Sequence, residues 1–348
     1  MAEMRDFYKN DTYRTDLEQA ICHSVGFSKL RDKSVLITGA TGLIGSFLAD
    51  TLMYANEVYG SNIHVYALGR NLERLQNRFH CFKGNAWFHF VEQDVNAPFN
   101  FDFKVDYLIH AASNAYPAAF NTDPVGTVLS NVVGTQRLLD YAYKVQTMRF
   151  LFVSSGEVYG ESQEEILKED FSGYVNPMSV RSCYPTSKRA AENLCVAYAR
   201  QYGLYTVVAR LCHTYGPNTT STDNRANVQF ISQAIRNENI VLKSQGLQRR
   251  SYCYVADCVS GILSVLLNGE NTAYNIANPL SVTTVVGLAE EIARQSHVKV
   301  VYQIEEKTDM QTPITHAILS TSKLENLGWS GIYNLSEGIE HTLNILKT

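Results

Sequence analysis

The chain has 348 residues, 45% of them hydrophobic and 18% charged, and 30 Lys and Arg against 34 Asp and Glu give a formal net charge of −4. This composition excludes a disordered, collagen-like or coiled-coil protein, and the lack of a basic stretch excludes a general nucleic-acid binder. No apolar run is long enough to span a membrane, and residues 1–30 carry charges throughout, so we expect no membrane association and a cytoplasmic protein.

Short β-branched segments alternate with longer amphipathic segments through the first two thirds of the chain. The predicted strands are Ser34–Thr38, Ile63–Leu68, Trp87–Val91, Val105–His110, Arg149–Ser154 and Tyr205–Leu211. The predicted helices between them are Ile44–Tyr54, Leu72–Phe79, Pro124–Tyr143 and Pro185–Tyr202. This alternation predicts an α/β protein with a doubly wound parallel sheet, the Rossmann fold.

The two ends of the chain predict additions to this sheet. We expect an N-terminal extension over residues 1–32, with a helix around Thr15–Cys22 that Thr15 caps and Glu18 closes as a capping box. After residue 212 the segment HTYGPNTTSTDNR indicates a long polar loop. Helices are expected at Val228–Arg236, Asp257–Leu267 and Thr284–Gln295, and extended segments at Ile240–Lys243, Ala273–Ile276 and Val298–Ile304. We therefore expect the Rossmann domain at 33–212 and a smaller C-terminal α/β lobe, mainly 213–348, interleaved with it.

Seven cysteines, an odd number with no CxxC pair, indicate free thiols in a reducing compartment rather than a disulfide framework. A zinc site that joins Cys253 and Cys258 to His213 is a weak alternative, and we predict no metal.

Three glycines follow the first predicted strand and open the next helix. Gly39, Gly42 and Gly45 have the spacing GxxGxxG, which lets the backbone turn tightly and approach a pyrophosphate at a helix N-terminus. The pattern predicts a dinucleotide site, and a glycine-rich turn kept for close packing is the alternative.

Residues at the ends of the second and third predicted strands are expected to contact the adenosine half of that dinucleotide. Gly69 and Arg70 stand where a NAD-selective site usually has Asp or Glu. The Arg70 guanidinium could pair with a 2′-phosphate, which would favour NADP, or stack beside the adenine of either cofactor. Asp94 is placed to accept a hydrogen bond from the adenine amino group, or is a solvated carboxylate at a strand end.

The segment YPTSK puts Tyr184 and Lys188 four residues apart, on one face of a predicted helix. A nearby ammonium and a nicotinamide charge would lower the phenol's pKa, so that Tyr184 can exchange a proton with a substrate hydroxyl. Ser155, with Ser154 as second choice, ends the fifth predicted strand, where a hydroxyl can hydrogen-bond a reacting oxygen. Glu157 is a candidate acid/base or hydroxyl acceptor, or else a cap for the following turn.

The segments TGATGLIG, HAAS, NVVGT, VSSGEVYG, YPTSK, ARLCHTYGP and RRSYCYVADC, in this order, resemble the extended short-chain dehydrogenase family of nucleotide-sugar epimerases, dehydratases and decarboxylases, over residues 33 to 345. The resemblance implies a tightly bound NAD, a nucleotide-sugar substrate and a homodimer. Helices Pro124–Tyr143 and Pro185–Tyr202 would pair into a four-helix interface, although their apolar residues could equally face the sheet. The cofactor site it implies comprises Gly39, Thr41, Gly42, Leu43, Ile44, Gly45, Arg70, Asp94, Val95, Ala111, Ala112, Ser113, Tyr184 and Lys188.

Within this family the chain looks most similar to UDP-glucuronate decarboxylases, because DNRANVQF and RRSYCYV resemble two of their segments. By that likeness Arg250 would contact the sugar carboxylate or the diphosphate and Arg225 the nucleotide side. The substrate site it implies comprises Glu157, His213, Arg225, Gln229 and Arg250.

Two positions depart from the family's pattern. Gly156 stands where the decarboxylases have Ser, within Thr-Ser-Glu, and where the 4,6-dehydratases have the Asp of Thr-Asp-Glu. His213 stands where the family commonly has Asn, and could instead simply pack under the loop.

The resemblance implies a common first step. Tyr184 removes the proton of the sugar C4 hydroxyl while hydride leaves C4 for the nicotinamide, Ser155 bonds the forming carbonyl, and Lys188 stabilises the phenolate. We expect a lyase or isomerase with an internal redox cycle, with UDP-glucuronate decarboxylation favoured over 4-epimerisation. A 4,6-dehydratase, an NADPH-dependent keto-sugar reductase and a non-enzymatic cofactor-sensing regulator are less favoured.

Overall fold

The computed structural model describes residues 7–220, 223–304 and 316–347. Its centre is a parallel sheet of seven strands: β1 (Ser34–Thr38), β2 (His64–Gly69), β3 (Phe88–Glu92), β4 (Tyr107–His110), β5 (Arg149–Ser155), β7 (Thr206–Leu211) and β11 (Ala273–Ile276). Their order is β11-β7-β5-β4-β1-β2-β3, so β1 lies between β2 and β4. The strand order reverses at β1, which opens a crevice at the carboxyl ends of β1 and β4. The predicted doubly wound α/β fold is confirmed.

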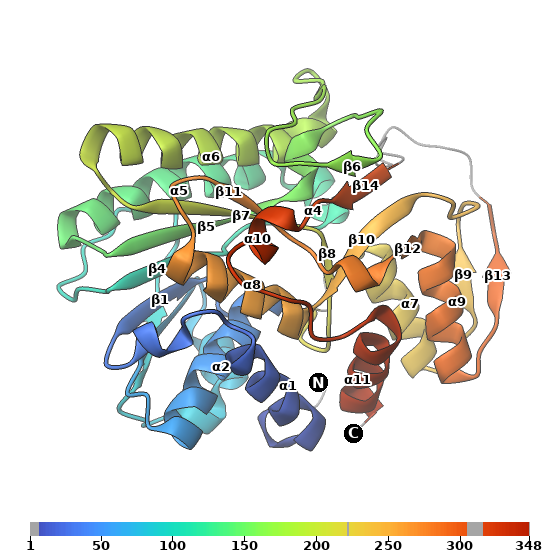
Figure 1. Cartoon of the computed structure of the whole chain (residues 1–348), viewed down its shortest axis with the longest axis horizontal. Coiled ribbons are helices and arrows are strands. Elements are labelled where there is room, and N and C mark those ends of the chain that lie inside the picture. Colours follow the sequence, from blue (N-terminus) through green and yellow to red (C-terminus); the bar gives the residue numbers. More distant parts are fainter. Residues whose placement is uncertain (1–6, 221–222, 305–315, 348) are drawn as a thin grey trace.

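Helices cover both faces of this sheet (Figure 1). Helices α5 (Pro124–Val145) and α6 (Cys183–Tyr202) pack on one face, and α2 (Leu43–Tyr59) and α8 (Val255–Asn268) on the other. Successive β1 residues supply both cores, since Leu36 belongs to the α5 and α6 side while Val35 and Ile37 belong to the α2 and α8 side. Helix α3 (Leu72–Arg78) follows β2, and α1 (Asp11–Cys22) packs outside α2 and α8.

The C-terminal lobe contains two small sheets beside the main one (Figure 1). The first has the order β12-β10-β14-β6, where β10 is Arg249–Tyr254, and its other strands are β12 (Val282–Thr284), β14 (His316–Leu319) and β6 (Ile166–Leu167). Strand β8 (His213–Tyr215) pairs in parallel with β10, and β9 (Ile240–Leu242) pairs with β13 (Val300–Tyr302). The lobe's helices are α7 (Ala226–Ile235), α9 (Val285–Ser296), α10 (Ser322–Glu325) and α11 (Leu335–Lys347), and the short α4 (Pro117–Thr122) precedes α5.

Strand β11 lies in the main sheet rather than in the C-terminal lobe. The sequence placed this segment in the C-terminal lobe, but it pairs with β7 as the seventh strand of the main sheet. Its buried Tyr274 and Ile276 join the same core as helix α8, which also packs on that sheet. One strand beyond residue 212, β11, therefore completes the Rossmann sheet, and helix α8 covers part of it.

Two local expectations also need correction. Helix α1 begins at Asp11 because the Asn10 side chain accepts a hydrogen bond from the Tyr13 amide at 3.0 Å, whereas Thr15 donates to the Asp11 carbonyl inside the helix. The segment expected as one long polar loop begins with strand β8, because Thr214 and Tyr215 are buried against β10.

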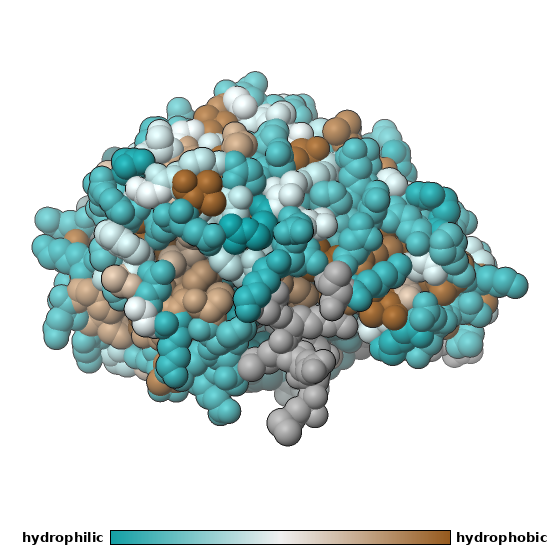
Figure 2. Space-filling model, turned by 90° about the horizontal axis from the view of Figure 1, so that it is seen from below, coloured by the Kyte–Doolittle hydropathy of each residue, from teal (hydrophilic) through white to brown (hydrophobic). Residues whose placement is uncertain are grey.

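Within the part of the chain that the structure describes, no helix is both long and apolar enough to cross a membrane. The face seen from below Figure 1 is mainly hydrophilic and carries small, separate apolar groups (Figure 2).

Candidate active site

The carboxyl ends of the main strands meet the C-terminal lobe around a pocket of about 510 Å³. Almost all residues assigned from the sequence line it: Gly39, Thr41, Gly42, Leu43, Ile44, Gly45, Arg70, Asp94, Val95, Ala111, Ala112, Ser113, Ser155, Glu157, Tyr184, Lys188, His213, Arg225 and Arg250. Gln229 lies instead in an adjoining cavity, because α7 carries it away from the pocket and its Nε2 donates to the Asn224 carbonyl at 2.7 Å.

The glycine loop leaves no room for a side chain at Gly39 or Gly45. Gly39 has φ +66°, and a Cβ there would lie 2.8 Å from the Ala112 Cα. A Cβ on Gly45 would overlap the Gly39 carbonyl oxygen. Helix α2 starts directly after Gly42, which has no side chain to cap it, so the first amides of the helix point at the pocket.

These features fit the pyrophosphate of a dinucleotide, which a helix N-terminus binds through its amides and its dipole. A second observation supports the fit: the Ser113 hydroxyl lines the pocket, is buried, and has no hydrogen-bond partner among the described residues. A buried hydroxyl in this state calls for a polar ligand or a water molecule.

The end of the pocket near β2 and β3, where we expect the adenosine, is more exposed. Arg70 is exposed just after β2, and Arg74, in the first turn of α3, lines the same pocket. Sequence reasoning missed Arg74, although it follows Arg70 by four residues. Asp94 is also exposed, and its Oδ1 accepts a hydrogen bond from the Asn96 amide at 2.9 Å.

The segment between β5 and α6 brings the candidate catalytic groups together. Tyr184 lies in the first turn of α6, only 6% exposed, with its ring stacked on Phe120 at 4.7 Å between centroids. Lys188 lies one turn later, where its Nζ donates to the Val153 carbonyl at 2.8 Å. Ser155 ends β5 and accepts a hydrogen bond from the Glu157 amide at 3.2 Å, so Ser155 rather than Glu157 caps the short turn that follows.

Burial pushes both titrating groups of this pair toward their neutral forms. Burial, followed by the Glu157 carboxylate, raises the pKa of Tyr184 to about 12, although a hydrogen bond with Ser155 opposes this. Burial likewise lowers the pKa of Lys188 to about 7, against the field of Glu192. Among the described residues burial outweighs every group that lowers the pKa of Tyr184, and the lowering expected from an ammonium together with a nicotinamide charge stays a prediction.

An arginine that sequence reasoning missed fixes Glu157. Arg181 lies just before α6, and its Nη2 is 2.9 Å from Glu157 Oε1. The Arg181 guanidinium also packs 4.8 Å from the centre of the Phe120 ring. Because an ion pair needs the carboxylate form, Glu157 is held as a hydrogen-bond acceptor at the pocket wall. The sequence signal was present, since Arg181 precedes Tyr184 by three residues.

Cationic groups line the side of the pocket formed by the C-terminal lobe. Arg250 is buried on β10. Arg225 Nη2 is 2.6 Å from Asp223 Oδ2, and Arg225 Nε donates to the same carboxylate at 3.0 Å. Burial, then Arg250 and Arg225, lower the pKa of His213 to about 3, so its imidazole is neutral. This side can bind an anion while His213 acts as a neutral donor or acceptor.

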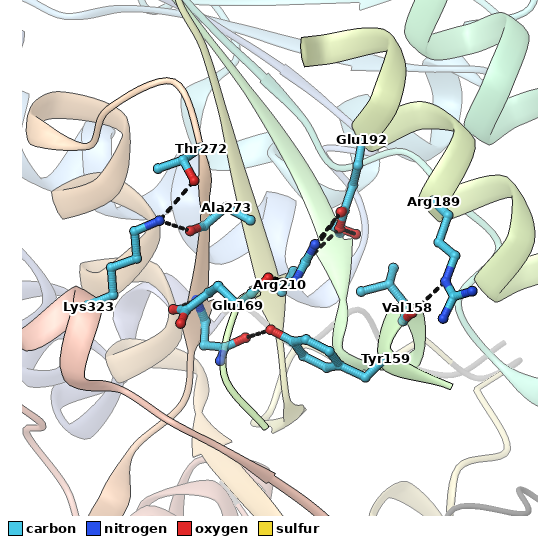
Figure 3. Close-up of polar contacts among 11 residues, drawn as sticks. Val158, Tyr159, Glu169, Arg189, Glu192, Arg210, Thr272, Ala273 and Lys323 are labelled. Carbon is cyan, nitrogen blue, oxygen red and sulfur yellow. Dashed lines mark hydrogen bonds and ion pairs between the residues drawn. The ribbon is translucent and has the colours of Figure 1, made fainter. Parts of the chain in front are cut away.

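A polar network supports the strand ends behind the pocket (Figure 3). Glu192, one turn after Lys188 on α6, accepts a hydrogen bond from the Ser154 hydroxyl at 2.6 Å. Its other contact is an ion pair with Arg210 of β7 at 2.7 Å, and the Arg210 guanidinium lies 4.9 Å from the centre of the Tyr159 ring. The Tyr159 hydroxyl in turn donates to Asn275 Oδ1. The network thus joins α6, β5, β7 and β11 next to Ser155.

The structure offers no metal centre in the residues it describes, since no three His, Cys, Asp or Glu side chains there are grouped to hold a metal ion. All seven cysteines are free thiols, three of them buried.

Comparisons with known proteins agree with this geometry. Residues 35–277 match the model of the NAD dependent epimerase/dehydratase family. The chain is 35% identical over 307 residues to UDP-glucuronic acid decarboxylase 3 of Arabidopsis thaliana, covering 88% of this chain and 86% of that one. It is 32% identical over 316 residues to UDP-glucuronic acid decarboxylase 1 of Danio rerio, covering 89% and 72% of the two chains.

Solved structures show the same fold. UDP-glucose 4-epimerase from Thermotoga maritima superposes with a TM-score of 0.75 at 25% identity, over 90% of this chain and 98% of that one. A dTDP-glucose 4,6-dehydratase from Streptomyces venezuelae gives 0.76 at 22% identity, over 90% and 96%. Family model, relatives and pocket all point the same way, and we conclude that the chain is an enzyme of the NAD-dependent epimerase/dehydratase family.

Proposed function

We propose that the protein binds a nucleotide sugar and oxidises its C4, and that its reaction is the decarboxylation of UDP-glucuronate. The observation that carries the proposal is that Ser155, Tyr184 and Lys188 share one pocket with the buried Arg250. The first three suit oxidation of a hydroxyl, and the guanidinium suits a carboxylate or diphosphate. The 35% identity to UDP-glucuronic acid decarboxylases supports the same substrate class.

In this mechanism the residues of the chain hold the substrate and move its proton. Gly39, Gly42 and Gly45 would hold the pyrophosphate of NAD, which when bound supplies a hydride acceptor. The Tyr184 phenolate takes the proton of the C4 hydroxyl, and the Ser155 hydroxyl donates a hydrogen bond to the same oxygen as it becomes a carbonyl. The Lys188 ammonium stabilises the phenolate.

The C6 carboxylate is then β to the C4 ketone and can be lost as CO2. When CO2 departs, the electron pair of the C5–C6 bond stays on C5 as an enolate whose negative charge lies largely on the C4 oxygen. Ser155 and the protonated Tyr184 donate hydrogen bonds to that oxygen. Water then supplies the proton that C5 gains, the hydride that a bound NAD would have accepted returns to C4, and the proton held by Tyr184 returns to the oxygen, so no cofactor would be consumed.

Gly156 favours a second candidate, the 4-epimerisation of the same sugar. A Cβ at this position would lie 3.5 Å from its nearest neighbours, the Leu211 carbonyl oxygen and Leu319 Cδ1, which is an ordinary van der Waals contact. The backbone therefore has room for the Cβ of the decarboxylases' serine, so close packing around that atom does not explain the glycine. Without that hydroxyl, hydride return to the other face of the ketone competes with loss of CO2.

Dehydration, net reduction and a purely regulatory role have less support in the pocket. Gly156 removes the Asp expected of a 4,6-dehydratase. Arg70 would suit NADP and hence a net reductase, which would consume one NADPH for each keto sugar. A regulator without catalysis would have no use for the Tyr184 and Lys188 pair.

Product analysis tests the proposal. Purified protein is incubated separately with UDP-glucuronate, UDP-glucose and dTDP-glucose, without added NADPH, and CO2, epimer and 4-keto-6-deoxy sugar are measured. We expect turnover of UDP-glucuronate with release of CO2, and a Gly156→Ser variant with a higher ratio of CO2 to epimer. Turnover of none of the three would contradict the proposal.

We further propose a homodimer through α5 and α6. Several apolar side chains on these helices face solvent: Val125 is 67% exposed, Leu129 42% and Val196 55%. Burying such side chains against a second copy would remove apolar area from water. Light scattering should give twice the chain mass, and Val125→Glu with Leu129→Glu should give the mass of one chain.

The cytoplasm is the proposed compartment, because seven free thiols suit a reducing environment. Cell fractionation with an antibody to the protein checks this location.

A further inference from the structure

Helix α1 precedes the segment that matches the family and is nevertheless built into the core. Tyr13, Leu17 and Ala20 are fully buried on its inner face, against α2, α8 and α11. The same helix carries two buried polar anchors, Tyr13 and Asp16. Tyr13 contacts α2 and Asn218, whereas Asp16 contacts β10 and α11. Substitutions at the two anchors are therefore expected to have different effects on the pocket.

The Tyr13 anchor joins three segments at one hydroxyl. Tyr13 Oη donates to Asp50 Oδ2 of α2 at 2.7 Å and accepts from Asn218 Nδ2 at 2.6 Å. Arg78, the last residue of α3, forms an ion pair with the same Asp50 oxygen. The Tyr13 ring packs edge-on against Phe47 of α2, 5.3 Å between centroids. Tyr13, Asp50 and Asn218 are buried, so removing the Tyr13 hydroxyl breaks the link that it makes between Asp50 and Asn218, while Asp50 keeps Arg78 and Asn218 keeps Ser46.

Asn218 connects this anchor to the glycine loop. Its Nδ2 also donates to Ser46 Oγ at 3.0 Å, and the Ser46 amide makes the first hydrogen bond of α2, to the Gly42 carbonyl at 2.9 Å. Two residues beyond Asn218, Thr220 lines the dinucleotide pocket. Segment 217–220 is thus fastened to the start of α2 through a side chain that Tyr13 holds.

We propose that Tyr13 is a positioning residue for the cofactor, which fixes segment 217–220 against the first turn of α2 and so slows release of the bound dinucleotide. The inference rests on the pocket being a dinucleotide site. It gives the N-terminal extension a function: in a closed redox cycle the cofactor is regenerated in place, and slow release keeps the enzyme loaded between turnovers.

The Asp16 anchor provides a matched control. Tyr254 Oη donates to Asp16 Oδ2 at 2.6 Å, and His341 Nδ1 lies 2.7 Å from Asp16 Oδ1. This pair of contacts ties the same helix to β10 and α11, and neither Tyr254 nor His341 lines the pocket. Tyr254→Phe therefore removes a buried tyrosine-to-carboxylate hydrogen bond from α1 just as Tyr13→Phe does, but at a distance from segment 217–220.

The test measures the dissociation rate of NADH from the full chain, chased with excess NAD and followed by NADH fluorescence. We expect Tyr13→Phe and Asn218→Ala each to raise this rate by about fivefold or more, and the double variant to match the larger single effect because both changes break one link. Tyr254→Phe should lower the melting temperature about as much as Tyr13→Phe and leave the rate unchanged.

Two results would overturn the inference: a wild-type rate in Tyr13→Phe, or an equal acceleration in Tyr254→Phe, which would indicate general loosening of α1. If the wild-type protein binds neither NADH nor NADPH, the dinucleotide site itself is refuted. Cofactor binding to the wild-type protein thus distinguishes failure of the proposed dinucleotide site from failure of the proposed role of Tyr13.

Discussion

Replacing Glu192 with Gln would test whether the network behind the pocket sets the charge of Lys188. Glu192 and Arg210 form a largely buried ion pair, with 12% and 13% of their side chains exposed. Glu192 also accepts from the Ser154 hydroxyl, and its carboxylate opposes the effect of burial on the pKa of Lys188. Glu192→Gln keeps nearly the same side-chain size and removes the negative charge that acts on both Arg210 and Lys188.

The structure sets the expected loss of stability. Removing one partner of a buried ion pair costs about 3–5 kcal/mol, because the other charge is left uncompensated. Arg210 keeps its hydrogen bond from Nη1 to the Glu169 carbonyl at 2.8 Å, and Gln retains one acceptor oxygen. We therefore expect the lower end, a loss of about 3 kcal/mol in the free energy of unfolding, measured by urea titration.

The second readout is the pH profile of the enzyme. Burial already lowers the pKa of Lys188 to about 7, and losing the Glu192 charge lowers it further. The ammonium is lost as pH rises through that pKa, so the alkaline limb of kcat/KM should move to lower pH in Glu192→Gln. A merely structural role would reduce stability and leave the limb in place.

Glu57→Gln is the control, since Arg14 and Glu57 form a similar pair at 2.7 Å with 29% and 50% of their side chains exposed. An exposed pair contributes about 0–1 kcal/mol, and this variant should keep the wild-type pH profile. The reasoning is refuted if Glu192→Gln unfolds within about 1 kcal/mol of the wild type and keeps its alkaline limb.

Three further predictions concern single residues. Tyr184→Phe should retain substrate binding, measured by calorimetry, and lose about 10²- to 10⁴-fold in kcat, because the ring remains and the proton acceptor is removed. Arg70→Asp should raise the ratio of the Kd for NADP to the Kd for NAD by at least about tenfold, and an unchanged ratio would mean that the guanidinium only stacks on adenine. The hydrogen bond with Asp16 raises the pKa of His341 above its ordinary value of 6.5. The stability it contributes is complete below that ordinary pKa and is lost as pH rises through the raised one, so urea titrations across this range should show a fall that His341→Gln lacks.

The sequence predicted those parts of the site that local spacing determines. The glycines, the Tyr184 and Lys188 pair and Ser155 each lie at a strand end or on one helix face, and all of them line one pocket. In a parallel sheet the carboxyl ends of the strands share an edge, so predicting the strands was enough to gather these residues.

The missed features depend on tertiary contacts. Strand β11 has four residues, and nothing in so short an apolar segment says which sheet it joins. Glu192 follows Lys188 by four residues, so its place on the same helix face was predictable, but its pairing with Arg210 across two elements was not. Tyr13 and Asn218 are separated by 205 residues and had no local signal at all.

The pKa values of Tyr184 and Lys188 indicate that substrate binding and the ionisation of this catalytic pair are coupled. Burial raises the pKa of Tyr184 to about 12 and lowers that of Lys188 to about 7, so near neutral pH the phenol is protonated and only part of the Lys188 ammonium remains. On the side of the C-terminal lobe the buried Arg250 can attract an anionic substrate despite the net charge of −4, whereas Arg225 is already paired with Asp223. An anion bound beside Lys188 favours its ammonium, and the ammonium in turn favours the Tyr184 phenolate. This order predicts that the alkaline limb lies at higher pH in kcat, which reports the complex, than in kcat/KM, which reports the free enzyme.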